Sequence, residues 1–132
     1  MDDFIINSIF ITTDNDPNPT YYFEVGKDDK KIDFTLHIQV LYMMTNSMYG
    51  LTYTITDAKT GKEIISTQEV FQTPMPTKVD ENQISAELTT DISIDTKNII
   101  IGNALQFHII LKGKEASFTA LVLGKEDGDW YA

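Results

Sequence analysis

The chain has 132 residues, with 20 acidic and 10 basic side chains, so its formal net charge at pH 7 is −10. This length fits a single domain that buries its own hydrophobic core. There is no cysteine, and every basic side chain is a lysine, which excludes disulfides and thiolate chemistry and, with the negative charge, argues against binding of nucleic acid or anionic membranes.

Apolar and polar residues alternate with a period of two along much of the chain. The clearest case is 32–40, where every even-numbered residue is apolar and every odd-numbered residue is polar. This pattern places one face of a β-strand on a core and the other in water. Seven strands are predicted, with 21–25 as a weaker eighth; in chain order they are 4–13, 21–25, 31–42, 50–57, 62–71, 83–95, 104–112 and 116–124.

Turn-forming residues separate these strands. Residues 57–62 predict a tight hairpin in which Gly61 takes a positive φ, and 112–115 predict a second hairpin. Two pairs of prolines predict loops over 14–19 and 72–82, because proline cannot donate a hydrogen bond to a neighbouring strand.

Short strands joined by frequent turns predict an all-β fold, a single antiparallel β-sandwich of seven to eight strands with immunoglobulin-like, Greek-key connections. The resemblance is one of architecture, because the paired cysteines of immunoglobulin domains and the tryptophan between them are absent. We expect residues 1–124 to form the sandwich. Residues 125–132 are expected to form a short acidic and aromatic tail, which either docks on another chain or folds back on the sandwich.

This topology sorts the loops into two ends of the sandwich. One end, which we call the methionine pole, gathers the loops 43–49, 72–82 and 112–115. The other end, the acidic pole, gathers 14–30, 57–62, 96–103 and the C-terminal tail. If 21–25 instead pairs with the strand at 4–13, the loops 14–19 and 26–30 fall at opposite ends.

The methionine pole is unusually apolar for a set of loops, with four of the chain's five methionines. Methionine adapts to irregular partners, and tyrosine suits interfaces with a wet edge. These properties predict a protein-recognition surface made of Tyr42, Met43, Met44, Met48, Tyr49 and Met75. The alternative is that these side chains fold inward and close the end of the core.

The acidic pole contains a pattern that is typical of calcium ligands. Asp14, Asp16 and Asn18 are spaced so that alternate side-chain oxygens can converge on this hard cation. A helix–loop–helix calcium loop would need glycine in place of Pro19 and glutamate in place of Val25. The pattern therefore predicts a cation site at the sandwich edge, completed by a carboxylate from a neighbouring loop, or else solvated turn-forming acids.

Residues suited to catalysis are few. The histidines, His37 and His108, lie on the polar faces of strands that belong to different sheets of the predicted sandwich, so we expect both to be exposed and to face opposite directions. No serine elbow, phosphate-binding glycine loop or zinc-protease motif is present. The adjacent carboxylates lie in loops rather than in an apolar setting that shifts a pKa. We expect no enzyme and no catalytic residue, with a hydrolase of unfamiliar site as the alternative.

These features predict a non-enzymatic binding or assembly module that recognises another protein, or a second copy of itself, through the methionine pole or an open sheet edge. The alternative is a sandwich that binds a cation or a carbohydrate at the acidic pole, and calcium is the one cofactor that the sequence leaves open. Neither nucleic acid nor membrane insertion is expected. The N-terminus has no signal-peptide pattern, so the chain as given is expected in the cytoplasm, or outside the cell if it is a trimmed part of a secreted protein.

Overall fold

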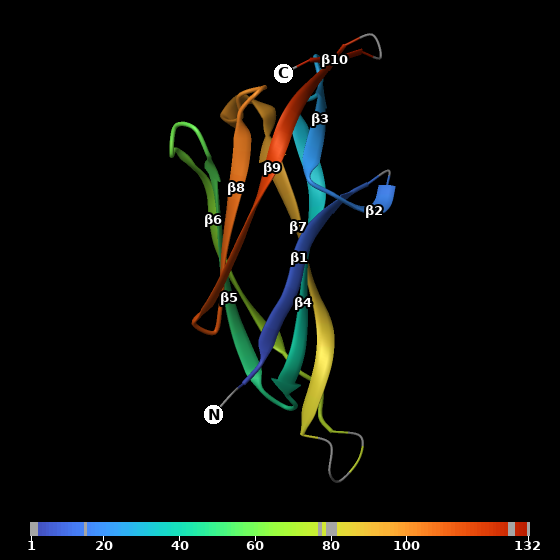
Figure 1. Cartoon of the computed structure of the whole chain (residues 1–132), viewed down its shortest axis with the longest axis vertical. Helices are drawn as coiled ribbons and strands as arrows, with labels where there is room; N and C mark the ends of the chain where they lie inside the picture. Colours follow the sequence, from blue (N-terminus) through green and yellow to red (C-terminus); the bar gives the residue numbers. More distant parts are fainter. Residues whose placement is uncertain (1–2, 15, 77, 79–81, 127–128, 132) are drawn as a thin grey trace.

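The computed structural model describes residues 3–14, 16–76, 78, 82–126 and 129–131. Within these residues the chain forms ten strands, which make two sheets packed face to face (Figure 1). In chain order the strands are β1 (Ile5–Thr13), β2 (Asp16–Thr20), β3 (Tyr22–Gly26), β4 (Lys31–Met44), β5 (Met48–Asp57), β6 (Glu63–Gln72), β7 (Gln83–Asp95), β8 (Ala104–Leu111), β9 (Lys114–Glu126) and β10 (Asp129–Tyr131).

The first sheet, sheet I, has the strand order β2-β1-β4-β7, and the second, sheet II, has the order β10-β9-β8-β5-β6. Strand β3 joins sheet II beside β9 and runs parallel to it, whereas all other pairs are antiparallel. The chain crosses between the sheets from β2 to β3, from β3 to β4, from β4 to β5, from β6 to β7 and from β7 to β8. The last three crossings are those of an immunoglobulin-like Greek key, so the predicted β-sandwich is confirmed. The described residues form ten strands rather than seven to eight, and one pair is parallel.

The core lies between the sheets and follows from the alternation in the sequence. Along β4, the even-numbered side chains from Ile32 to Val40 are buried, and the odd-numbered ones face outward. Aromatic rings connect the two sheets: Phe34 packs on Phe23 at 4.8 Å between ring centroids and on Phe107 at 5.7 Å. Each such fully buried side chain stabilises the fold by about 1.5–3 kcal/mol.

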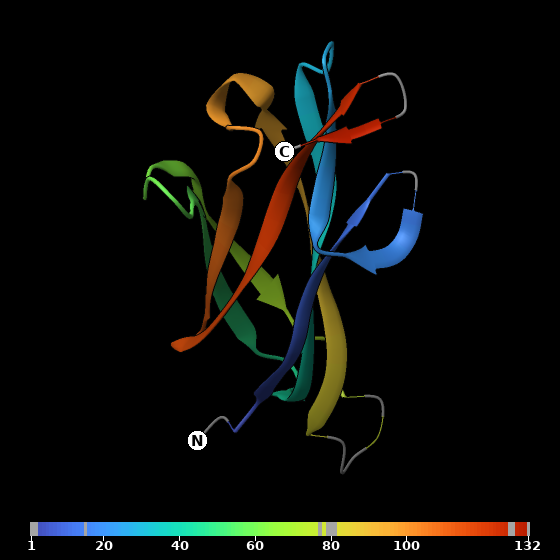
Figure 2. The ribbon, with the colours of Figure 1, turned by 45° about the horizontal axis from the view of Figure 1, so that its top comes forward.

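The N-terminal region changes sheets within a few residues. Strand β1 belongs to sheet I and β3 to sheet II, and the β1–β2 hairpin stands out from the side of the sandwich between them (Figure 2). The predicted loop over 14–19 is therefore partly a strand. Its prolines, Pro17 and Pro19, fit because β2 is an end strand, where the missing N–H groups cost no hydrogen bond to a neighbour.

The predicted hairpin turns are confirmed. Gly61 and Gly113 have positive φ angles of 76° and 87°, and Lys112 has a φ of 46°. At the C-terminal end, β9 continues to Glu126, and β10 pairs with it, with Tyr131 opposite Gly124. The division of the chain at residue 124 stays a prediction. No helix in the described part of the chain is long and apolar enough to cross a membrane.

Candidate functional site

The loops of the methionine pole meet as predicted. The amide of Thr45 donates to the carbonyl of Asn82 at 3.0 Å, and the amide of Asn46 donates to the carbonyl of Pro74 at 2.8 Å. The buried hydroxyl of Thr73 donates to the carbonyl of Met44 at 2.7 Å and accepts from the amide of Ser47 at 2.8 Å. These bonds join the β4–β5 turn to the loop that follows β6.

Two of the six residues predicted to form the recognition surface belong to the core. Met43 and Tyr49 are both 0% exposed. The hydroxyl of Tyr49 accepts a hydrogen bond from the amide of Met44 at 2.8 Å, and its ring packs edge-on against Phe4 at 5.3 Å. The alternative stated above, an inward-facing plug that closes the core, therefore holds for these two residues.

Met43 and Tyr49 are buried because the strands that carry them are longer than predicted and because β4 changes phase along its length. Strands β4 and β5 extend further than the sequence predicts, which leaves only residues 45–47 between them. The register between β4 and β7 shifts between Val40 and Met43, and Tyr42 has a positive φ of 62°. This bulge adds a residue and turns Met43 toward the core.

The other four predicted residues lie nearer the surface. Tyr42, Met48 and Met75 are 49%, 62% and 64% exposed, whereas Met44 is half-buried. They come from β4, from the start of β5 and from the loop after β6. Protein recognition by these side chains stays a prediction.

At the acidic pole, a cleft of about 360 Å³ lies between the β1–β2 hairpin, β3 and the beginning of β4. Five carboxylates and one lysine are among its lining residues: Asp14, Asp16, Glu24, Asp29, Asp33 and Lys31. Two of these carboxylates are held by their own turns, since Asp16 accepts from the amide of Asn18 at 2.9 Å and Asp29 accepts from the amide of Gly26 at 2.7 Å.

These carboxylates do not converge on a point. Across the described residues, no group of three or more histidine, aspartate or glutamate side chains is arranged to hold a metal ion. Asp14, Asp16 and Asn18 are all exposed. The geometry therefore does not favour the predicted calcium site, and the cleft remains a polar, acidic surface.

Asp57 has a structural task at the same pole. Its buried carboxylate accepts from the side-chain amide of Asn103 at 3.0 Å and from the backbone amides of Thr60 and Lys59, each at 2.9 Å. These hydrogen bonds, that of Asn103 first, hold the pKa of Asp57 below its ordinary value of 3.8, although desolvation opposes them. Asp57 thus ties the β5–β6 hairpin to the β7–β8 connection.

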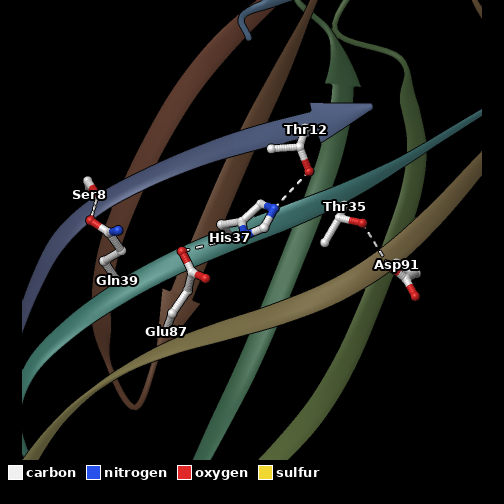
Figure 3. A network of polar contacts seen from close by, with 7 residues as sticks. All are labelled: Ser8, Thr12, Thr35, His37, Gln39, Glu87 and Asp91. Atoms are coloured by element: carbon white, nitrogen blue, oxygen red, sulfur yellow. Dashed lines mark hydrogen bonds and ion pairs between the residues drawn. The ribbon is translucent and has the colours of Figure 1, made fainter. Parts of the chain in front are cut away.

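The outer face of sheet I carries a polar network around His37 (Figure 3). The Nε2 atom of His37 lies 2.8 Å from the hydroxyl of Thr12, and its Nδ1 atom lies 3.5 Å from Oε1 of Glu87. Phe10 stacks on the imidazole at 4.5 Å. As a result the side chain is only 16% exposed, so the prediction of an exposed His37 is wrong.

The sequence does not predict that Phe10 packs over His37, because apolar and polar residues do not alternate regularly along 4–13. The register between β1 and β4 shifts between Ile6 and Ser8, which changes the phase of β1. His108 is exposed, on sheet II, and its Nε2 atom lies 3.0 Å from Oε1 of Glu115. The two histidines therefore lie on different sheets, as predicted, and share no site.

Strand β7 forms the end of sheet I. In the described part of the chain, β4 is the only strand hydrogen-bonded to it, in a register that runs unbroken from Asp95 to Ala86. Its inward side chains include the buried Leu88, Ile92 and Ile94. Its outward side chains are all exposed, and three of them are acidic: Glu87, Asp91 and Asp95.

The end strand of sheet II, β6, lies on the same side of the sandwich. Glu69 on β6 is opposite the buried Leu51, so its side chain points inward. There its carboxylate accepts from the hydroxyl of Thr90 on β7 at 2.7 Å. The two neighbouring edges therefore differ, because β6 carries an inward-facing charge and the inward side chains of β7 are uncharged.

Comparisons with known proteins support the fold. The sequence matches no protein-family model and no curated protein. Among solved structures, the chain is similar to a glycosyl hydrolase family 2 member from Bacteroides cellulosilyticus, with a TM-score of 0.60, 13% identity and 91% of this chain covered. It is also similar to a β-glucuronidase from Bacteroides uniformis, with a TM-score of 0.56, 11% identity and 93% covered.

A third similar structure is a bacterial adhesin from Mobiluncus mulieris, with a TM-score of 0.57, 13% identity and 87% of this chain covered. The chain spans 14% of each of the two hydrolase chains and 56% of the adhesin. At these identities the likeness concerns the sandwich fold alone.

Proposed function

We propose that this chain is a non-enzymatic binding module that recognises a protein by accepting an extended segment of it beside β7. The observation that carries the proposal is the open edge of β7, a strand of 13 residues that ends sheet I. An end strand presents backbone N–H and C=O groups without a neighbour, and a segment from another protein can pair with them.

The edges of this sandwich are protected to different degrees. Proteins guard edge strands with charged side chains, above all lysine, and with proline, bulges, inward-facing charges or short length. Strand β2 is short and has two prolines, and β6 has the inward-facing Glu69. Strand β7 contains neither lysine nor proline, and its one register shift lies near its beginning, between Ala86 and Ile84. Its edge charges are the outward-facing acids alone, so among β2, β6 and β7 it is the most accessible edge for strand pairing.

The similar structures support a modular role. Each belongs to a protein longer than this chain, in which the matching sandwich is one part. The absence of a convergent metal-binding group among the described residues leaves the alternative, cation binding at the acidic cleft, without a supporting observation.

The proposal is tested by selecting short binding peptides from a random displayed library with the whole chain as bait. Amide hydrogen exchange then locates the bound peptide. We expect slower exchange at the β7 amides that face away from β4, with no change along β6. Slower exchange confined to the surroundings of Tyr42, Met48 and Met75 would assign recognition to the methionine pole and overturn the β7 proposal.

A pair of matched variants tests the same point. Thr89→Lys with Ser93→Lys places lysines on the exposed face of β7. Gln106→Lys with His108→Lys places them on the exposed face of β8, where both residues pair with β5 on one side and with β9 on the other. Because edge lysines oppose strand pairing, we expect the β7 variant to lose about tenfold in peptide affinity, or about 1.4 kcal/mol. The β8 variant is expected to bind like wild type.

A further inference from the structure

The open edge of β7 presents a regular row of charge. Glu87, Asp91 and Asp95 are spaced four residues apart on its outward face, so they lie about 13 Å from one another along an extended strand. The outward positions between them are small hydroxyl residues, Thr89 and Ser93, which leave room for side chains of a neighbouring strand. Any segment that pairs with this edge lies alongside this acidic row.

The chain itself neutralises this row only in part. Asp95 forms an exposed ion pair with Lys97 at 3.7 Å. Asp91 accepts a neutral hydrogen bond from the hydroxyl of Thr35 at 2.8 Å, and Glu87 faces the imidazole of His37 (Figure 3). Among the described residues, no lysine makes an ion pair with Glu87 or Asp91.

A second copy of the chain, paired through its own β7, brings no basic side chain to this edge, because β7 contains neither lysine nor arginine. In an antiparallel self-pairing centred on Thr89, Glu87 of one copy would lie opposite Asp91 of the other, and like charges directly opposite destabilise a strand pair. Each copy also carries a net charge of −10, which opposes association at long range.

We infer that the segment accepted by β7 is a basic one from another protein, with lysine or arginine at every fourth residue on the face that meets Glu87, Asp91 and Asp95. This inference rests on the proposed function and adds the chemistry of the partner. The backbone hydrogen bonds supply affinity whatever the sequence, and the charges supply specificity and a faster, salt-sensitive association.

The test uses three nine-residue peptides that alternate valine with polar residues. They differ only at the first, fifth and ninth positions, which all lie on one face and carry lysine, serine or glutamate. Binding to the full chain is measured by titration at low and at high salt. We expect the lysine peptide to bind about tenfold more tightly than the serine peptide, with the difference reduced at high salt, and the glutamate peptide to bind most weakly.

The matched variants are Glu87→Gln with Asp91→Asn on β7, and Glu63→Gln with Asp28→Asn, two exposed acids away from that row. The β7 variant should bring the affinity of the lysine peptide down to that of the serine peptide and leave the serine peptide unchanged. The second pair should change neither. A thermal melt of each variant establishes that it is folded.

The outcomes separate the two levels of the proposal. If serine and lysine peptides bind equally and both slow exchange at β7, the basic partner is overturned and the edge function stands. If the lysine peptide binds the Glu87→Gln, Asp91→Asn variant as tightly as it binds the wild type, it binds another acidic surface, and the inference is overturned. If no peptide slows exchange at β7, the proposed function itself fails. Slowed β7 exchange in the free protein at rising concentration would instead assign the edge to a second copy.

Discussion

The methionine pole and the β7 edge differ in how their composition relates to their exposure. The methionine pole has the composition of a recognition surface, yet Met43 and Tyr49 are fully buried and its loops are fixed by hydrogen bonds around Thr73. The β7 edge has the composition of an ordinary amphipathic strand, yet its backbone ends a sheet. Strand phase and sheet order, rather than residue type, decide which groups are available to a partner.

The largest effect on stability is expected from substitutions within the methionine pole, where buried and exposed methionines can be compared. Met43→Asp places a carboxylate in the core, so we expect it to lower the free energy of unfolding by more than about 3 kcal/mol or to prevent folding. Met48→Asp adds the same group at a position that is 62% exposed, and the expected change is within about 0.5 kcal/mol. Chemical denaturation measures both, and equal losses would contradict the separation of the pole into core and surface.

A smaller loss is expected from Tyr49→Phe. This change removes the hydroxyl that accepts from the amide of Met44 at 2.8 Å but keeps the ring in contact with Phe4. We expect a loss of about 1 kcal/mol in denaturant unfolding, because a partly buried N–H is left without its acceptor. Tyr42→Phe, at an exposed position, serves as the control, and an equal loss there would show that the Tyr49 hydroxyl has no special role.

Much of this fold could be predicted from the sequence because strand alternation is a local property. The boundaries of β7 agree with the prediction, and Gly61 has the positive φ that its turn requires. The departures occur where one residue changes the phase of a strand, as at the bulge beside Tyr42 and at the shift between Ile6 and Ser8. Such shifts depend on the partner strand, so the burial of Met43 and the stacking of Phe10 on His37 are not visible in local sequence.

An open sheet edge was expected from the sequence, but the strand that forms it could not be predicted, for a different reason. Which strand ends a sheet depends on the order of all strands in space, and 83–95 carries the same alternation as the inner strand 32–40. The signal that could have drawn attention to it was the acidic residue at every fourth position, together with the absence of lysine and proline. In contrast, the calcium-like spacing of Asp14, Asp16 and Asn18 led to exposed residues, and no group of three histidine, aspartate or glutamate side chains among the described residues is arranged to hold a metal ion.

At the acidic pole, the carboxylate of Asp57 stabilises the fold rather than facing a partner. Asp57 has a lowered pKa when folded, so its hydrogen bonds stabilise the protein above the unfolded value of about 3.8, and this contribution is lost as the pH falls through the folded pKa. We expect the denaturant concentration at the unfolding midpoint of the wild type to decrease when the pH is lowered below about 4. Asp57→Asn should lower the midpoint at neutral pH and flatten this acid dependence, whereas Asp28→Asn, at an exposed turn, should do neither.

The smallest change in stability is expected at the β7 edge. Thr89→Lys on β7 and Gln106→Lys on β8, which pairs with a strand on each side, introduce the same side chain at exposed strand positions, and neither should alter the free energy of unfolding by more than about 0.5 kcal/mol. The Thr89 position lies on the outward face between Glu87 and Asp91, so its lysine is accommodated by opposite charges. A large loss at Thr89 alone would mean that the outward face of β7 is needed for folding, and any loss of binding in β7 variants would then report misfolding. If both substitutions change stability little and equally, the two strands differ only in whether their backbone lies at the edge of a sheet. A difference in peptide binding between the two variants then measures strand pairing itself.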